Sequence, residues 1–84
     1  PREGAHPELG HRFHDIYKKE VDKSLAQAIS DDPMWIFLSS RYGRTNRSEW
    51  FAELMSLYMS GSKNHYRIPP QVLSMIKSKD KLNG

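Results

Sequence analysis

The sequence predicts an all-α fold of about four helices, and three observations support this prediction. Apolar residues recur at steps of three and four, which is the spacing of one face of an α-helix. Prolines and capping residues stand where these stretches begin. No stretch shows the alternating pattern of a half-buried strand. With 84 residues, the chain has the size of a single small helical domain, residues 1–84, or of a fragment of a larger domain.

The first helix is expected from about Pro7 to Ile29. Pro7 suits the first helical position because its missing N–H needs no partner there, and Glu8 in the first turn complements the helix dipole. Its apolar stripe consists of Leu9, Phe13, Ile16, Tyr17, Val21, Leu25 and Ala28.

A short helix is expected over residues 34–38, because Asp32 can cap it and Pro33 can open it. A third helix is expected from Arg47 to Ser60, with Gly61 as its natural stop. One side of this helix is apolar, with Trp50, Phe51, Leu54, Leu57 and Tyr58.

The last helix is expected to begin at the Pro69-Pro70 pair and to bury Val72, Leu73 and Ile76. The segments between the helices are expected to be loops. The two tryptophans, Trp35 and Trp50, are expected to anchor the core. The four methionines, Met34, Met55, Met59 and Met75, are expected to fill it.

Composition excludes several functional classes. The chain has no cysteine, so disulfides, cysteine zinc sites and thiol nucleophiles are excluded. No apolar stretch approaches the roughly 20 residues that a membrane-spanning helix needs. The net charge is +3, and residues 63–84 contribute five basic residues and one acid. No nucleic-acid partner is predicted, since no aromatic stacking platform accompanies this basic tail.

Two of the expected helices carry an acidic face. Glu49 and Glu53 lie within about 40° of each other around one helix, and Glu8, His11 and Asp15 lie within about 60° around another. These residues have two interpretations. Glu49 can belong to a capping box with Asn46, while the other acids and the histidines are ordinary surface residues. Alternatively, the two faces form a metal site.

One segment bears on this choice. Residues 40–53 read Ser-Arg-Tyr-Gly-Arg-Thr-Asn-Arg-Ser-Glu-Trp-Phe-Ala-Glu. They resemble the closing active-site segment of the anthrax lethal factor family of zinc metallopeptidases, Tyr-Gly-x-Thr-Asn-x-x-Glu-aromatic-Phe-Ala-Glu. The resemblance extends over residues 7–60. It implies zinc as cofactor and hydrolysis of a peptide or protein substrate, with Glu49 as a zinc ligand and Tyr42 as donor to the oxyanion.

The family also has a His-Glu-x-x-His motif, and Pro7-Glu8-Leu9-Gly10-His11 is similar to it. The resemblance makes His11 a zinc ligand and Glu8 the general base, with Asp15 and Glu53 supporting the ligands. Pro7 replaces the first histidine of the motif and cannot bind a metal. The candidate replacement is the adjacent His6, and His14, one turn after His11, is a second possibility.

The resemblance therefore allows two functions. The first is zinc-dependent peptide hydrolysis by the helical active-site and C-terminal part of a zincin domain without its sheet, with Pro7 impairing the activity. The alternative is a non-catalytic module that keeps the helices and binds a protein partner, since the family includes metal-free copies that dock on a translocation pore. The family consists largely of secreted or delivered toxins, which implies the same localisation here.

Overall fold

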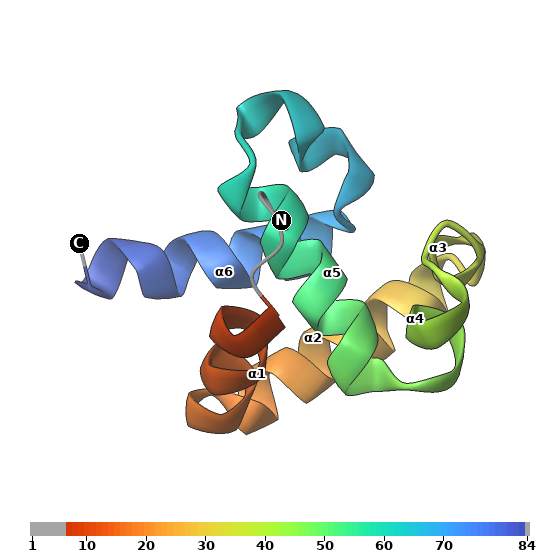
Figure 1. Cartoon of the computed structure of the whole chain (residues 1–84), viewed down its shortest axis with the longest axis horizontal. Coiled ribbons are helices and arrows are strands. Elements are labelled where there is room, and N and C mark those ends of the chain that lie inside the picture. The colour runs from red at the N-terminus through yellow and green to blue at the C-terminus, as the bar shows by residue number, and fades with distance from the viewer. Residues whose placement is uncertain (1–6, 84) are drawn as a thin grey trace.

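The computed structural model describes residues 7–83, and within this range it consists of helices joined by short connections, with no strand. The predicted all-α fold class is confirmed. Figure 1 shows the order of the elements along the chain. They are α1 (Pro7–Ile16), α2 (Lys18–Asp31), α3 (Met34–Phe37), α4 (Arg41–Thr45), α5 (Arg47–Met59), the 3₁₀ helix η1 (Ser62–Arg67) and α6 (Pro70–Asn83).

Helix α5 lies at the centre of the molecule and packs against α1, α4 and η1 (Figure 1). The Asn46 side chain caps its first turn, because Oδ1 accepts from the backbone N–H groups of Ser48 at 2.9 Å and Glu49 at 3.3 Å. The helix ends within one residue of the predicted position. Its buried side chains are Trp50, Phe51, Ala52, Leu54 and Met55.

The hydrophobic core forms where α2, α5 and α6 meet. Helix α6 packs along α2, and the chain enters α6 through the buried pair Ile68 and Pro69. Around Trp50, Phe51 and their neighbours on α5, the core contains Val21, Leu25 and Ala28 from α2, and Ile68, Val72 and Ile76 from the last segment. The apolar face that the sequence predicts for the last helix thus packs against the core.

The single first helix predicted over residues 7–29 is wrong, because the chain breaks at Tyr17 into α1 and α2. Tyr17 has φ −113° and ψ 42°, outside the helical region. The two halves pack on different partners, α1 on α5 and α2 on α6, so one straight helix cannot satisfy both. As a result, Leu9 and Ile16 of the predicted stripe are exposed.

Two segments expected to be loops are helical. Ser40 caps α4 because its Oγ accepts from the N–H of Gly43 at 3.3 Å, and η1 follows Gly61. The prediction that all four methionines fill the core is also wrong, since Met34 and Met59 are exposed. They lie at the ends of α3 and α5, where no other element covers them.

Part of the basic C-terminal segment packs back on the fold. The Lys79 ammonium is 3.2 Å from Oε2 of Glu20 and lies 5.0 Å from the centre of the Tyr17 ring. Tyr58 donates from its hydroxyl to Asp80 at 2.8 Å, and this bond, together with burial, raises the pKa of Tyr58. No helix within residues 7–83 combines the length and apolar character needed to cross a bilayer.

Candidate functional site: His11 and Glu49 at the crossing of α1 and α5

Helices α1 and α5 approach each other closely at Gly10. A Cβ atom on Gly10 would lie 2.7 Å from the Cα atom of Ala52 and 3.1 Å from its Cβ. Such distances are shorter than any ordinary van der Waals contact, so only glycine fits at this point. The crossing therefore holds the next residue of α1, His11, beside the preceding turn of α5.

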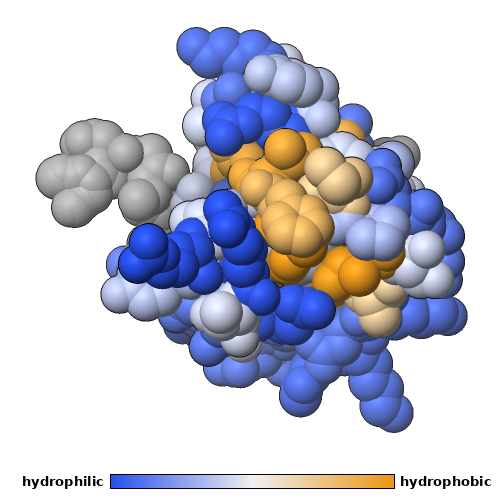
Figure 2. All heavy atoms as spheres, turned by 90° about the vertical axis from the view of Figure 1, so that its right-hand side faces the viewer, coloured by the Kyte–Doolittle hydropathy of each residue, from blue (hydrophilic) through white to orange (hydrophobic). Residues whose placement is uncertain are grey.

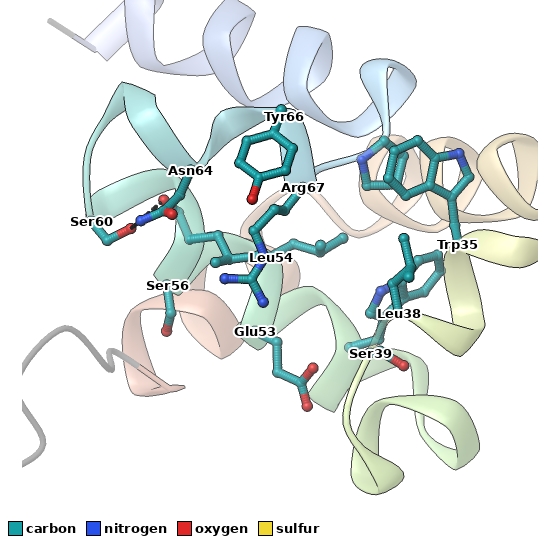
Figure 3. A pocket seen from close by; sticks show the side chains of 13 residues that line it. Trp35, Leu38, Ser39, Glu53, Leu54, Ser56, Ser60, Asn64, Tyr66 and Arg67 are labelled. Atoms are coloured by element: carbon teal, nitrogen blue, oxygen red, sulfur yellow. Dashed lines mark hydrogen bonds between the residues drawn. The ribbon is translucent and has the colours of Figure 1, made fainter.

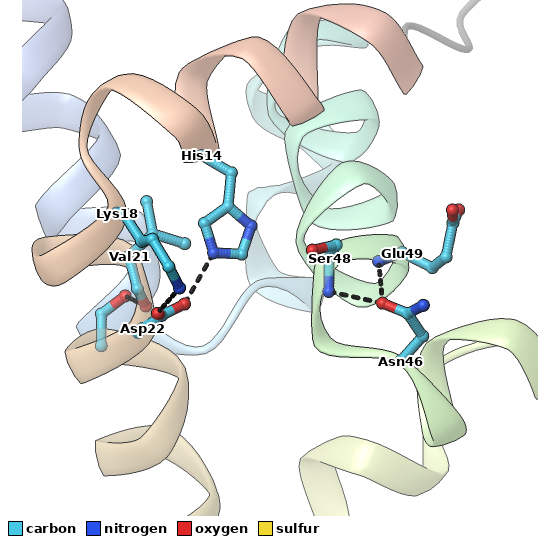
Figure 4. A network of polar contacts seen from close by, with 8 residues as sticks. His14, Lys18, Val21, Asp22, Asn46, Ser48 and Glu49 are labelled. Carbon is cyan, nitrogen blue, oxygen red and sulfur yellow. Dashed lines mark hydrogen bonds and ion pairs between the residues drawn. The ribbon is translucent and has the colours of Figure 1, made fainter.

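The two predicted ligands His11 and Glu49 meet at this crossing. Nε2 of His11 is 3.5 Å from Oε2 of Glu49, and both side chains are partly exposed. Figure 4 shows the Glu49 carboxylate pointing away from the Asn46 side chain that caps the helix. Glu49 thus takes part in the cap through its backbone N–H, while its carboxylate contacts the imidazole.

The distance between these two atoms fits a zinc site. Zinc binds histidine nitrogen and carboxylate oxygen at about 2.0–2.2 Å in a tetrahedral arrangement, so two donor atoms lie about 3.3–3.5 Å apart. The His11 and Glu49 atoms match two corners of such a site. Within residues 7–83, no three His, Asp or Glu side chains are grouped so that they could hold a metal ion. The candidate third ligand, His6, lies outside the described residues.

The other predicted site residues of α1, Glu8 and Asp15, have exposed side chains. Glu8 is one turn before His11, which places the two on the same side of the helix. Neither acid forms a hydrogen bond or ion pair with any residue in the part of the chain that the structure describes. They are therefore accessible to solvent or to a ligand.

Tyr42 and Glu53 lie on the α4 side of α5. The Tyr42 side chain is 75% exposed. The Glu53 carboxylate accepts from the Ser40 backbone N–H at 3.1 Å and from the Ser40 hydroxyl, rather than from a histidine. Gly43 permits this contact, since a Cβ there would lie 2.9 Å from Cβ of Ser39 and 3.2 Å from Oε1 of Glu53. In this structure Glu53 fixes α4 to α5.

His14, the second candidate replacement ligand, is buried and bonded to another side chain of the fold. Its side chain is buried, with 7% exposed, and Nε2 donates to Oδ1 of Asp22 at 2.7 Å (Figure 4). The other nitrogen, Nδ1, is buried without a hydrogen-bond partner. The Asp22 carboxylate also accepts from Lys18 at 2.6 Å. The bonds from Lys18 and His14, in that order, lower the pKa of Asp22.

The sequence did not indicate that His14 links α1 to α2. His14 and Asp22 are eight residues apart and lie on either side of the break at Tyr17. A continuous helix would keep these two residues about two turns apart along its axis, so their contact could be predicted only from knowledge of the break.

Comparisons with known proteins assign no family to this chain. It matches no protein-family model, no curated protein and no solved structure. The resemblance of residues 40–53 to the lethal factor family therefore remains a prediction from the sequence.

Replacing Gly10 by alanine should force α1 and α5 apart. The new methyl group meets the Ala52 backbone, which cannot rotate away, so we expect a loss of about 1–3 kcal/mol of unfolding free energy despite the better helix propensity of alanine. Denaturant unfolding followed by circular dichroism measures the change. Unaltered or increased stability would show that the close crossing is not required.

Replacing Asp22 by asparagine should change how stability depends on pH. The folded-state pKa of Asp22 is below its ordinary value of 3.8, so its contribution is present above pH 3.8 and is lost as the pH falls through the folded pKa. Because nearly half of the side chain is exposed, we expect a loss of about 1 kcal/mol at pH 7 that shrinks below pH 4. Thermal unfolding from pH 2.5 to 7 measures this.

The matched control is D15N, which makes the same charge change at an exposed carboxylate on α1. Its unfolding temperature should stay parallel to that of the unmodified chain over the whole pH range. Equal profiles for the two variants would contradict the stabilising role of Asp22.

Proposed function

We propose that this chain is the helical part of a zinc metallopeptidase site, in which His11 and Glu49 bind the metal and a peptide is the substrate. The observation that carries the proposal is the 3.5 Å separation of Nε2 of His11 and Oε2 of Glu49. Two donor types that zinc prefers meet at a separation that suits it, from two helices held together at Gly10. Their partial exposure leaves room for a substrate.

The resemblance to the lethal factor family implies the remaining roles, and the side chains have the chemistry that these roles need. A bound zinc ion lowers the pKa of a coordinated water and polarises the substrate carbonyl. Glu8, one turn before His11 and exposed, accepts a proton at its carboxylate and later returns it to the leaving amine. Tyr42 has an exposed hydroxyl that is free to donate to an oxyanion. In the proposed mechanism Asp15 supports the ligands from α1.

A catalytic zinc site usually has three protein ligands. Pro7 has no side-chain donor, and His6 is the imidazole next to it in the sequence. We therefore include His6 as the third ligand of the proposed site. The second candidate function, a metal-free module for a protein partner, is favoured by the replacement of the first motif histidine by Pro7.

A measurement of zinc binding distinguishes the zinc peptidase from the metal-free module. If His11 and Glu49 are ligands, about one zinc per chain should remain after dialysis, and a zinc concentration of 100 times the dissociation constant should stabilise the fold by about 2.7 kcal/mol. Elemental analysis and thermal unfolding with and without zinc measure this. E49Q should abolish the zinc-induced stabilisation, whereas E20Q, an exposed carboxylate on α2, should keep it. Absence of zinc and of any stabilisation would favour the metal-free module.

The peptidase mechanism makes a further prediction at Glu8. An amide cannot accept the proton, so E8Q should reduce peptide hydrolysis by at least about 100-fold while the zinc content stays unchanged. The assay is cleavage of a mixed peptide library by the zinc-loaded chain, followed by mass spectrometry. Full activity of E8Q would rule out Glu8 as the general base.

A further inference from the structure

A second surface of the molecule is an open groove between α3, α5 and η1, with a volume of about 840 Å³. This volume is large enough to take up several side chains of another chain. Figure 3 shows Trp35 and Leu38 on one side of the groove, Leu54 at its base, and Tyr66 with Arg67 on the other side. The groove is thus apolar at its base and bounded by two separate elements, α3 and η1.

Helix α3 places exposed apolar side chains directly beside the groove. Met34 and Phe37 are each 59% exposed, and Leu38, which follows the helix and lines the groove, is 67% exposed. Figure 2, which views the side of the molecule that carries α3, shows an apolar patch surrounded by hydrophilic side chains. Such a contiguous patch with a polar rim is typical of an interaction surface. The same face therefore carries both a hollow and, next to it, apolar side chains that suit a hollow of this kind.

Two of the side chains that line the groove are charged, and their charges are opposite. Arg67 is exposed, and within residues 7–83 it forms no ion pair. Glu53 accepts hydrogen bonds from Ser40, but a carboxylate has further lone pairs and can accept from an arginine as well. Figure 3 shows the Arg67 side chain extending over the groove, between Tyr66 and Glu53. The lining of the groove is therefore neutral in sum and offers one group of each sign.

We propose that the groove and α3 together form the interface of a two-fold symmetric homodimer. In such a dimer the same patch of both chains forms the interface, so every feature of the patch needs its complement within that patch. Phe37 and Leu38 of one copy enter the groove of the second copy, and Arg67 pairs with Glu53 of the second copy. The two-fold axis repeats both contacts in the opposite direction.

The pair of opposite charges is the observation that selects a second copy as the occupant. A partner surface with a single sign of charge would bring like charges together at either Arg67 or Glu53, which lowers affinity. A second copy turned by 180° places each of these groups opposite its counter-charge. The exposed apolar side chains supply the main driving force, since burial of apolar area dominates most protein association. The proposal does not depend on zinc, because neither His11 nor Glu49 lines the groove.

The experiment is sedimentation equilibrium of the full 84-residue chain over a range of concentrations, in the presence of EDTA. We expect a monomer–dimer equilibrium. R67E brings like charges together at both symmetry-related contacts, so it should weaken the dimer at least about tenfold. L38S removes an apolar side chain from each half of the interface and should weaken the dimer at least about fivefold.

A mixture of two variants tests the pairing of Arg67 with Glu53 directly. E53K alone should also weaken the homodimer at least about tenfold, because cationic groups then face each other at both contacts. When R67E and E53K are mixed, each charged group meets an opposite charge again. The mixed dimer should therefore form with an affinity within about threefold of the unmodified dimer. A fluorescent label on one variant, followed by sedimentation with fluorescence detection, measures the mixed dimer.

Two matched variants control for charge and for apolar surface. K77E makes the same charge change as R67E at an exposed position of α6, and I16S removes a 62% exposed apolar side chain from α1. Both should dimerise within about twofold of the unmodified chain. Circular dichroism should show that all five variants are folded. R67E and L38S keep the test decisive if E53K does not fold, since Glu53 also contacts Ser40.

Three outcomes would overturn the proposal. These are a chain that remains monomeric up to about 1 mM, a dimer that R67E and L38S leave unchanged, and a mixture of R67E and E53K that dimerises no better than either variant alone. Because EDTA removes zinc, failure of this experiment leaves the metal-site proposal unaffected, and a failure to bind zinc leaves the dimer proposal unaffected.

Discussion

The close crossing of α1 and α5 at Gly10 is the constraint on which the candidate site depends. A glycine facing Ala52 lets two helices approach almost to backbone contact, and His11 follows Gly10 directly. Glu49 lies three residues before Ala52 and so faces the same partner helix. Gly10 and Ala52 thus set the distance between the two helix axes. This distance in turn brings the side chains of His11 and Glu49 close together. Any side chain at position 10 would increase the spacing and separate the two donor atoms.

Acidic side chains on neighbouring turns of α5 contact different elements of the fold. Glu49 and Glu53 share one ridge of the helix, yet Glu49 contacts His11 on α1 and Glu53 contacts Ser40 before α4. A difference of about 40° around the axis and one turn along it is enough to reach separate elements. Of these two acids, Glu53 joins α4 to α5, whereas Glu49 lies beside the imidazole of His11 on α1. Gly43 matters for the contact of Glu53, because it lets α4 come close to this side chain.

The sequence predicted the fold class, the bounds of α5, its Asn46 cap and the start of α6, because these depend on local signals such as apolar spacing, capping residues and proline. It also named His11 and Glu49, which the fold brings together. It did not predict the break at Tyr17, since an apolar stripe looks the same whether it packs on one partner or two. The partners of Glu53 and His14, which are Ser40 and Asp22, were not predicted for a related reason, because these contacts follow from how the helices are positioned in space.

Helix α5 carries both surfaces, and their residues are interleaved in the sequence but separated around the helix. Glu49 and Ala52 face α1, whereas Glu53 and Leu57 line the groove beside α3 and η1. Loss of metal chemistry therefore would not require loss of partner binding. A chain of this design can retain one surface while the other changes, because a single capped helix supports both.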